Sequence, residues 1–414
     1  MKIIVLFFVF FLAIISIVNA QEARSISDQD KPVLTGSGFV KAEALFDTRQ
    51  VVEAREGYLL LYPKKAELDK AGKDINAHGS FNQYAMFSRL AVRLTGAEAM
   101  GAKVVAHIEG DFTGASNAEN NSLRLRHAYV KLSWPSVSVL AGQYWHPLDI
   151  PEMIPNVLAL NTGAPFHPFS RQPQVRVDVK KGKLNGVFAF ASQRDFTNTG
   201  PAGSGSIYVR NSILPNLHAQ LQFAGSTLFA GIGADFKQLT PRLVTDSLYK
   251  TKEHINCYSV TAFAKATFNM LTIKTQALYG QGLNDHLMMG GYGVTDINPT
   301  TNHMEYTPLN YLSAWLTINT NGKKWQGSLF LGYTKGYGAE DDIVGPVYAR
   351  DPEIAYIWRF APLITYFAGK FSVASEFELT TASYGNKDSK YKITTTGISP
   401  VTNARFSLSA TYSF

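Results

Sequence analysis

The last eleven residues of the chain alternate without a break between apolar and polar side chains. Successive side chains of a β-strand point to opposite faces, so this segment has one apolar and one polar face. The apolar face carries Ala404, Phe406, Leu408, Ala410, Tyr412 and Phe414. Strands of about 9 to 11 residues with one apolar face are the spanning units of transmembrane β-barrels. The carboxyl terminus therefore predicts an all-β membrane protein.

The amino terminus has the pattern of an export signal. Lys2 precedes an apolar run over residues 3–18, and Ala20 ends a site of the kind that a signal peptidase reads. We expect cleavage after Ala20, which makes residues 1–20 a signal peptide, 21–36 a short periplasmic segment and 37–414 the barrel. An uncleaved anchor helix is the alternative. Together, the two ends of the chain predict a location in the outer membrane of a Gram-negative bacterium.

Composition excludes several other classes of protein. The 414 residues are 45% hydrophobic, and no second run of about 18 apolar residues is present, which excludes a helical membrane bundle. Cys257 is the single cysteine, and the nine histidines show no metal-ligand spacing, so we expect neither a metal nor another cofactor. The formal net charge is +7, but Lys and Arg are spread along the chain rather than gathered in runs. This distribution argues against nucleic acid and suggests a charged pore lining.

Sixteen segments are predicted as strands, and the gaps between them are alternately short and long. The segments are 38–47, 84–95, 102–113, 123–134, 136–145, 174–181, 184–194, 207–223, 227–237, 256–268, 271–281, 306–319, 325–336, 354–367, 370–384 and 400–414. Short periplasmic turns and long external loops give this rhythm in outer-membrane barrels, and an even strand number returns both termini to the periplasm. The sequence therefore predicts a transmembrane antiparallel β-barrel of about 16 strands.

Three of these segments are irregular. Segment 123–134 changes the phase of its alternation, which a β-bulge near His127 would explain. Segment 207–223 is interrupted by Pro215, and segment 354–367 contains Pro362. Proline has no amide hydrogen for the ladder of a sheet, which disfavours a regular strand at these two positions.

The gap over residues 146–173 is long and rich in proline and apolar residues, so we expect it to pack inside the barrel. Here the chain resembles the trimeric bacterial porins, in which the third external loop folds into the lumen and narrows it. Segments 124–132 and 137–143 resemble the fourth and fifth strands of that family. Residues 171–176 further resemble the branch of porins that is associated with dicarboxylates.

The resemblance implies a constriction in which acidic loop residues oppose basic wall residues. Asp149 and Glu152 would be the loop carboxylates, and the wall cations opposite them would be Arg89, Arg93, Arg124 and Arg126. Opposite charges across a narrow passage create a field that orients dipolar solutes and selects ions. The alternative is that the two acids only fix the loop by pairing with an arginine.

The predicted wall is basic in its first half. The cations that we expect to bind solute there are Arg89, Arg93, Arg124, Arg126, Arg176 and Lys180, with Lys103 and Lys131 nearby. Such groups bind carboxylate or phosphate oxygens, which favours anionic solutes, dicarboxylates among them. Alternatively, they pair with lipopolysaccharide phosphates or with the neighbouring acids Glu109, Asp111 and Asp178.

These observations favour a porin that lets small hydrophilic, anionic solutes diffuse passively, and not an enzyme. A structural or enzymatic barrel without an open channel is the alternative, although no nucleophile motif surrounds His107 or His127. Outer-membrane lipid and lipopolysaccharide would surround the barrel. The resemblance also implies a homotrimer, and outward alanines such as Ala42, Ala44 and Ala410 would permit a flat subunit contact.

Overall fold

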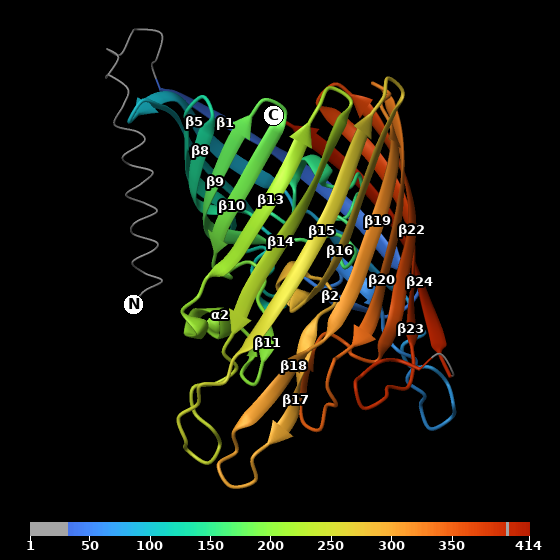
Figure 1. Ribbon diagram of the computed structural model, residues 1–414. Helices are drawn as coiled ribbons and strands as arrows, with labels where there is room; N and C mark the ends of the chain where they lie inside the picture. The colour runs from blue at the N-terminus through green and yellow to red at the C-terminus, as the bar shows by residue number, and fades with distance from the viewer. Residues whose placement is uncertain (1–31, 395–396) are drawn as a thin grey trace.

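The structure is a computed structural model that describes residues 32–394 and 397–414. The predicted signal peptide and residues 21–31 lie outside the described residues. The described chain forms one closed antiparallel β-barrel, with short turns at the end that carries the carboxyl terminus and long loops at the other end (Figure 1). No helix in the described part of the chain is both long and apolar enough to cross a membrane.

The barrel contains sixteen strands within the described residues, as predicted. Two strand segments, β4 (Ser80–Tyr84) and β5 (Arg89–Ala99), pair with successive parts of β1 (Val33–Asp47) and act as one strand. The others are β6 (Ala102–Asp111), β7 (Arg124–Ser133), β8 (Val137–Trp145), β9 (Arg171–Lys181), β10 (Leu184–Ala191), β13 (Asn216–Ala224), β14 (Leu228–Leu239), β15 (Ile255–Thr267), β16 (Leu271–Gln281), β19 (Asn310–Thr320), β20 (Trp325–Gly338), β22 (Ile354–Ala368), β23 (Phe371–Tyr384) and β24 (Ser399–Ser413).

The barrel closes where the first and last strands pair, from Phe39 with Ser413 to Asp47 with Arg405. The alternation of the last strand is confirmed. Phe406, Leu408 and Tyr412 are exposed on the outer surface, whereas Arg405, Ser407 and Ser409 are buried inside. Period-two patterning therefore sets which side of the wall each residue occupies.

The structure confirms the prediction for one irregular segment and corrects that for another. The bulge is confirmed: Glu109 pairs with His127 and Gly110 with Leu125, so Arg126 is the extra residue on β7. The predicted strand 207–223 is wrong in its first part, because Ile207–Ser212 form the short helix α2. Strand β13 begins at Asn216, directly after Pro215, since proline cannot donate a hydrogen bond to the ladder.

The long loops contain the remaining elements. These are β2 (Val51–Ala54), β3 (Leu59–Pro63), η2 (Asn117–Glu119), η3 (Pro151–Met153), β11 (Thr199–Gly200), β12 (Gly203–Ser204), α2, η4 (Leu283–His286), β17 (Gly291–Ile297), β18 (Met304–Pro308) and β21 (Val347–Ala349). We refer to four of these loops as L1 (48–79), L3 (146–170), L4 (192–215) and L6 (282–309).

Three loops fill part of the lumen with apolar side chains. L3 contributes Met153, Phe166 and Phe169, and L1 contributes Leu59 and its neighbours, to one buried cluster that includes wall residues of β19, β20 and β22. L6 adds three more residues, Leu287, Met289 and Leu309, to the same cluster. The predicted entry of the third loop is confirmed, whereas the entry of L1 was not predicted.

A glycine in the wall provides the space into which a side chain of L3 packs. A methyl group at Gly332 on β20 would lie 2.5 Å from the Phe166 ring, which also contacts the Phe330 ring and Arg359. The substitution Gly332→Ala should therefore displace Phe166 and destabilise the protein by about 1–3 kcal/mol. The readouts are urea unfolding in detergent and the rate of proteolysis within L3.

Gly327 on the same strand is the matched control. A methyl group there would have no atom within 4 Å, so Gly327→Ala should change the free energy of unfolding by less than about 0.5 kcal/mol. Equal stability of the two variants would show that Phe166 does not pack on Gly332.

Candidate functional site

L3 crosses the lumen from the wall where it begins to the opposite wall. It leaves β8, and its Asn156 carbonyl accepts a 2.8 Å hydrogen bond from Ser328 on β20, which lies on the far side of the strand order. Ser313 on β19 donates to the Phe166 carbonyl at 3.1 Å. The loop therefore divides the interior of the barrel.

Charged wall side chains hold the backbone of L3. Lys274 donates to the carbonyl of Ile154 at 2.7 Å, and Arg359 donates to that of Ala164 at 3.0 Å. At Leu158, the amide donates to Glu376 at 2.9 Å and the carbonyl accepts from Lys41 at 3.2 Å. Because backbone groups that enter a protein interior must be paired, these contacts determine the path of the loop.

A lumenal cavity of about 580 Å³ lies between L3 and the wall formed by β5 to β14. It reaches the turn between β7 and β8 at Trp134, Pro135 and Ser136, so it lies toward the end of the barrel with short turns. Pro147, Ile150 and Glu152 of L3 form its inner boundary. A solute that enters from the short-turn end would meet this cavity first.

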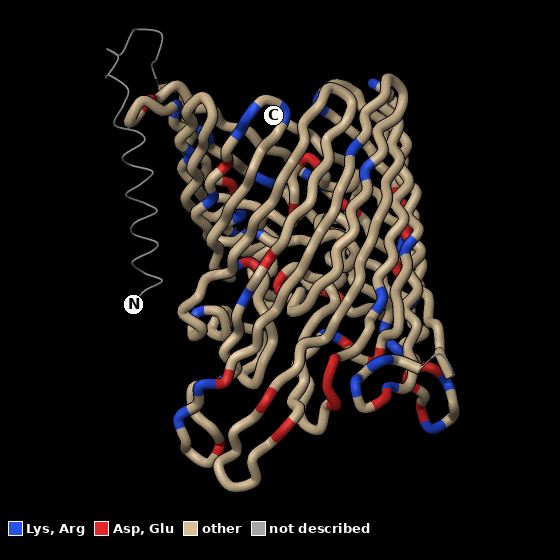
Figure 2. Tube along the Cα trace, in the orientation of Figure 1, with Lys and Arg blue, Asp and Glu red and all other residues tan. Residues whose placement is uncertain are grey.

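The charged lining of the cavity is mainly basic. It includes four cations, Arg93, Lys131, Arg176 and Lys180, and two carboxylates, Glu152 and Asp178. Figure 2 shows Lys and Arg on the side of the barrel that contains β5, β8 and β9. The lining therefore carries an excess of two positive charges.

The four cations differ in their partners. Arg176 binds Asp178 at 2.7 Å, which neutralises both groups. Arg93, Lys131 and Lys180 line the cavity and form no ion pair with another described residue. Arg93 and Lys180 are exposed, and Lys131 is half-buried. These three unpaired cations are the groups with which an anion in the cavity could interact.

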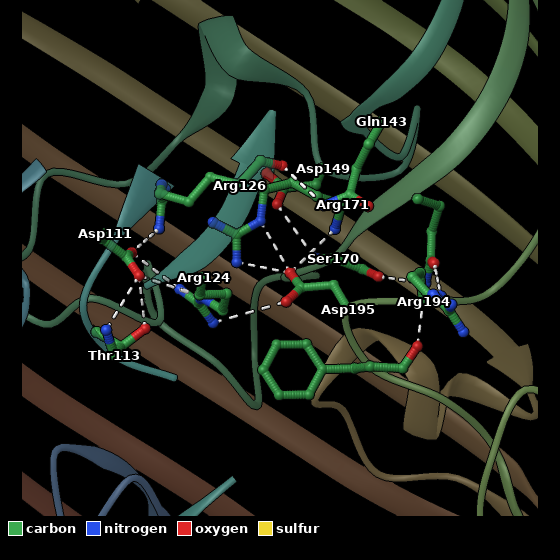
Figure 3. Close-up of polar contacts among 12 residues, drawn as sticks. Asp111, Thr113, Arg124, Arg126, Gln143, Asp149, Ser170, Arg171, Arg194 and Asp195 are labelled. Carbon is green, nitrogen blue, oxygen red and sulfur yellow. Dashed lines mark hydrogen bonds and ion pairs between the residues drawn. The ribbon is translucent and has the colours of Figure 1, made fainter. Parts of the chain in front are cut away.

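A second cluster of charges is buried toward the long-loop end (Figure 3). Asp111 accepts hydrogen bonds from Arg124 at 3.0 Å and from Arg126 at 2.7 Å. Asp195 of L4 accepts two hydrogen bonds from the Arg171 guanidinium, at 2.6 and 2.8 Å. Aromatic rings line this buried arginine cluster: the Arg171 guanidinium lies 4.8 Å from the ring centres of both Trp145 and Phe169.

Two acids beside Arg171 have opposite pKa shifts. Burial raises the pKa of Asp149 well above its usual value despite the nearby Arg171 charge. Burial acts in the same direction on Asp195, but the charges of Arg171 and Arg124 outweigh it, so the pKa of Asp195 is lowered. Direct hydrogen bonds to Arg171 are present only for Asp195, and Asp149 instead accepts a 3.4 Å bond from the Ser170 amide.

The eight predicted site residues separate into two groups. The lumenal cavity brings together Glu152, Arg93, Arg176 and Lys180. Asp149, Arg89, Arg124 and Arg126 lie elsewhere.

The structure places Asp149 away from the cavity, because its side chain is 0% exposed among residues of L3. Arg124 and Arg126 belong to the buried arginine cluster, and Arg89 lies 3.4 Å from Glu109. The alternative that wall cations pair with Glu109, Asp111 and Asp178 therefore describes Arg89, Arg124, Arg126 and Arg176.

Asp195 of L4 was not identified from the sequence as a member of the site, although it binds Arg171. No local pattern links residue 195 to residue 171, because their contact depends on how L4 folds back over β9. Gln220 and Gln222 of the cavity lining were also missed. Their inward alternation on β13 was obscured because the predicted strand began too early.

Removing the charge of Asp195 tests the buried arginine cluster. The substitution Asp195→Asn should destabilise the protein by about 3–5 kcal/mol, because it leaves the buried Arg171 without its partner. Asp149→Asn is the matched control, and we expect a change within about 1 kcal/mol because Asp149 forms no hydrogen bond with Arg171 and accepts only a 3.4 Å bond from the Ser170 amide. Urea unfolding in detergent measures both effects.

The pH dependence of the free energy of unfolding tests the contribution of Asp195 to stability. The pKa of Asp195 is lower in the folded protein than its value of 3.8 in the unfolded chain. Its carboxylate therefore stabilises the folded protein fully above pH 3.8, and this stabilisation is lost as the pH falls below 3.8. The stability difference between wild type and Asp195→Asn should therefore shrink on acidification below pH 3.8. A difference that stays constant would contradict the ion pair.

Comparison with known proteins gives the fold. No family model matches the chain, and no curated protein matches it. Among solved structures it is similar to the outer membrane channel DcaP of Acinetobacter baumannii, with 18% identity and a TM-score of 0.67 over 95% of this chain and 100% of that chain.

Two further solved structures are similar at lower identity. The anion-selective porin from Comamonas acidovorans is 11% identical, with a TM-score of 0.55 over 93% of this chain and 100% of that chain. The trimer form of OmpT, an outer membrane protein of Vibrio cholerae, is 10% identical, with a TM-score of 0.55 over 92% of this chain and 99% of that chain. The predicted resemblance to bacterial outer-membrane porins is thus confirmed at the level of the fold.

Proposed function

We propose that the protein is an outer-membrane channel through which small hydrophilic anions diffuse passively. The observation that carries this proposal is the lumenal cavity with three unpaired cations, Arg93, Lys131 and Lys180. Unpaired positive charges on a low-dielectric wall raise the local concentration of anions. The similarity of the fold to an anion-selective porin and to the channel DcaP also supports an anion channel.

The arrangement of the cations favours solutes with more than one negative oxygen. Lys131 and Lys180 are flexible ammonium groups, whereas Arg93 offers a planar guanidinium that can bind a carboxylate or phosphate through two hydrogen bonds. Glu152 borders the same space from L3. We therefore propose dicarboxylates or phosphate-bearing solutes as the substrate class, with Glu152 as the acid that limits anion preference.

Export, location and assembly belong to the same proposal. Residues 1–20 would direct export, and the barrel would lie in the outer membrane with lipopolysaccharide around its rim. A homotrimer is supported by the trimer form of one similar protein. Ala42, Ala44 and Ala410 line a shallow hollow of about 480 Å³ on the outer surface where β1, β4 and β24 meet, which leaves room for a neighbouring subunit.

A second candidate function is a barrel without an open channel. The apolar cluster that L1, L3 and L6 form inside the lumen favours it, because such a core excludes water and ions. The two candidates differ in conductance.

Planar-bilayer recording of the refolded protein tests the channel. We expect stepwise conductance, a reversal potential in a KCl gradient that indicates anion preference, and partial block by a dicarboxylate or phosphate but not by maltose. A silent bilayer with correctly folded protein would favour the second candidate.

The substitution Glu152→Gln should increase anion preference, because it removes the only exposed L3 carboxylate that lines the described cavity. Asp149→Asn is the matched control, and it should leave the reversal potential unchanged because Asp149 is buried and does not line the cavity. A shift caused by Asp149→Asn, or none caused by Glu152→Gln, would contradict these assignments.

A further inference from the structure

Three potential metal ligands meet inside the barrel near the start of L3. His146 is the first residue of L3, and His218 and Asp235 are cross-strand neighbours on β13 and β14. Their exposed fractions are 1%, 4% and 4%. The residues thus come from three separate segments of the chain and share one buried space.

The separations among their ligand atoms suit a small divalent cation. His146 Nε2 lies 3.5 Å from Asp235 Oδ2, and His218 Nδ1 lies 3.3 Å from the same oxygen. All three ligand atoms lie within 4.8 Å of one another. Zinc bonds of about 2.0–2.2 Å in tetrahedral geometry place neighbouring ligands about 3.3–3.5 Å apart. Two of the three separations already have this length, and the third is at most 4.8 Å.

Asp235 forms no ion pair with a lysine or an arginine among the described residues, and only the two histidines lie within ion-pair distance. Asp285 of η4 pairs with Lys237 at 2.6 Å, and both side chains are buried. Asp235 accepts a hydrogen bond from the neutral amide of Asn216 at 2.8 Å. A buried carboxylate is costly without a counter-charge. With neutral imidazoles, the group has an excess of one negative charge, which a divalent cation would offset.

A third histidine beside the group has no hydrogen-bond partner for its ring. Both ring nitrogens of His286 are buried and unpartnered among the described residues. Its ring centre lies 4.7 Å from that of His146. Buried polar atoms in proteins are almost always paired, so an unpaired imidazole needs an explanation. His286 can supply a fourth ligand, the third nitrogen, to the same cation.

We propose that His146, His218 and Asp235 bind a zinc-type divalent cation, with His286 as the source of a fourth ligand. Two or three imidazoles with one carboxylate are a ligand set that zinc and its first-row neighbours prefer over calcium or magnesium. Binding replaces the present 2.7 Å contact between His146 Nε2 and Asn216 Oδ1. The site goes beyond the proposed channel function and does not depend on it.

The cation would fix the beginning of L3 to the wall. His146 belongs to the loop, whereas His218 and Asp235 belong to adjacent strands. L6 joins the same connection, because the Phe169 amide of L3 donates to the His286 carbonyl at 3.0 Å. Metal binding should therefore stabilise the folded barrel and slow proteolysis within L3.

The test begins with wild-type protein in detergent, treated with EDTA and then dialysed. Isothermal titration with Zn²⁺ should give one tight site per chain, and zinc should raise the unfolding temperature. Substituted Co²⁺ should give the intense visible absorption of tetrahedral coordination with nitrogen ligands. The cobalt spectrum needs no variant, so it tests the site even where substitutions prevent folding.

Two variants and a control assign the ligands. His218→Gln and Asp235→Asn should each weaken zinc binding by about 100-fold or more and abolish the cobalt spectrum. His254→Gln, at an exposed histidine in a loop, should leave both unchanged. Absence of a tight site in the wild type, an octahedral cobalt spectrum, or unchanged binding in both ligand variants would overturn the proposal.

Discussion

A loop that enters a barrel carries backbone amides and carbonyls that must find partners there, and this requirement organises the whole interior. The wall provides them through long charged side chains: Lys41, Lys274 and Arg359 donate to L3 carbonyls, and Glu376 accepts from an L3 amide. Hydrogen bonds to charged groups are stronger than neutral ones, so the loop is held without regular secondary structure of its own. The position of L3 then decides where open space remains.

The same requirement divides the basic residues of the wall into two kinds. Toward the long-loop end, Arg124, Arg126 and Arg171 are buried and paired with carboxylates, so their charges serve the packing of L3 and L4. Toward the short-turn end, Lys131 and Lys180 face open space without an acidic partner. A buried cation that is fully paired cannot also bind a solute without losing its partner. The proposed solute contacts therefore belong to the second kind alone.

Much of the wall was predictable, because alternation is a local property of the sequence. The strand number, the facing of β24 and the bulge at Arg126 followed from it. Only half of the predicted site residues line the cavity. Asp149 and Glu152 are three residues apart in one loop, and nothing local distinguishes them, yet the first is buried and the second lines the cavity. Glu152 lies in the short helix η3 and Asp149 lies before it, and η3 packs against β15 and β16, which are far away in the sequence.

The sequence by itself determined the period of the strands, the alternation of loop lengths and the identity of the inward residues, because each depends on neighbours along the chain. Tertiary structure alone decided which inward charges are paired, that L1 enters the lumen beside L3, and that His146 lies next to His218 and Asp235. These outcomes depend on residues that are separated by tens to hundreds of positions. Closing a barrel brings such residues together across the lumen. The alternation of apolar and polar residues does not predict which loop will contact which part of the wall.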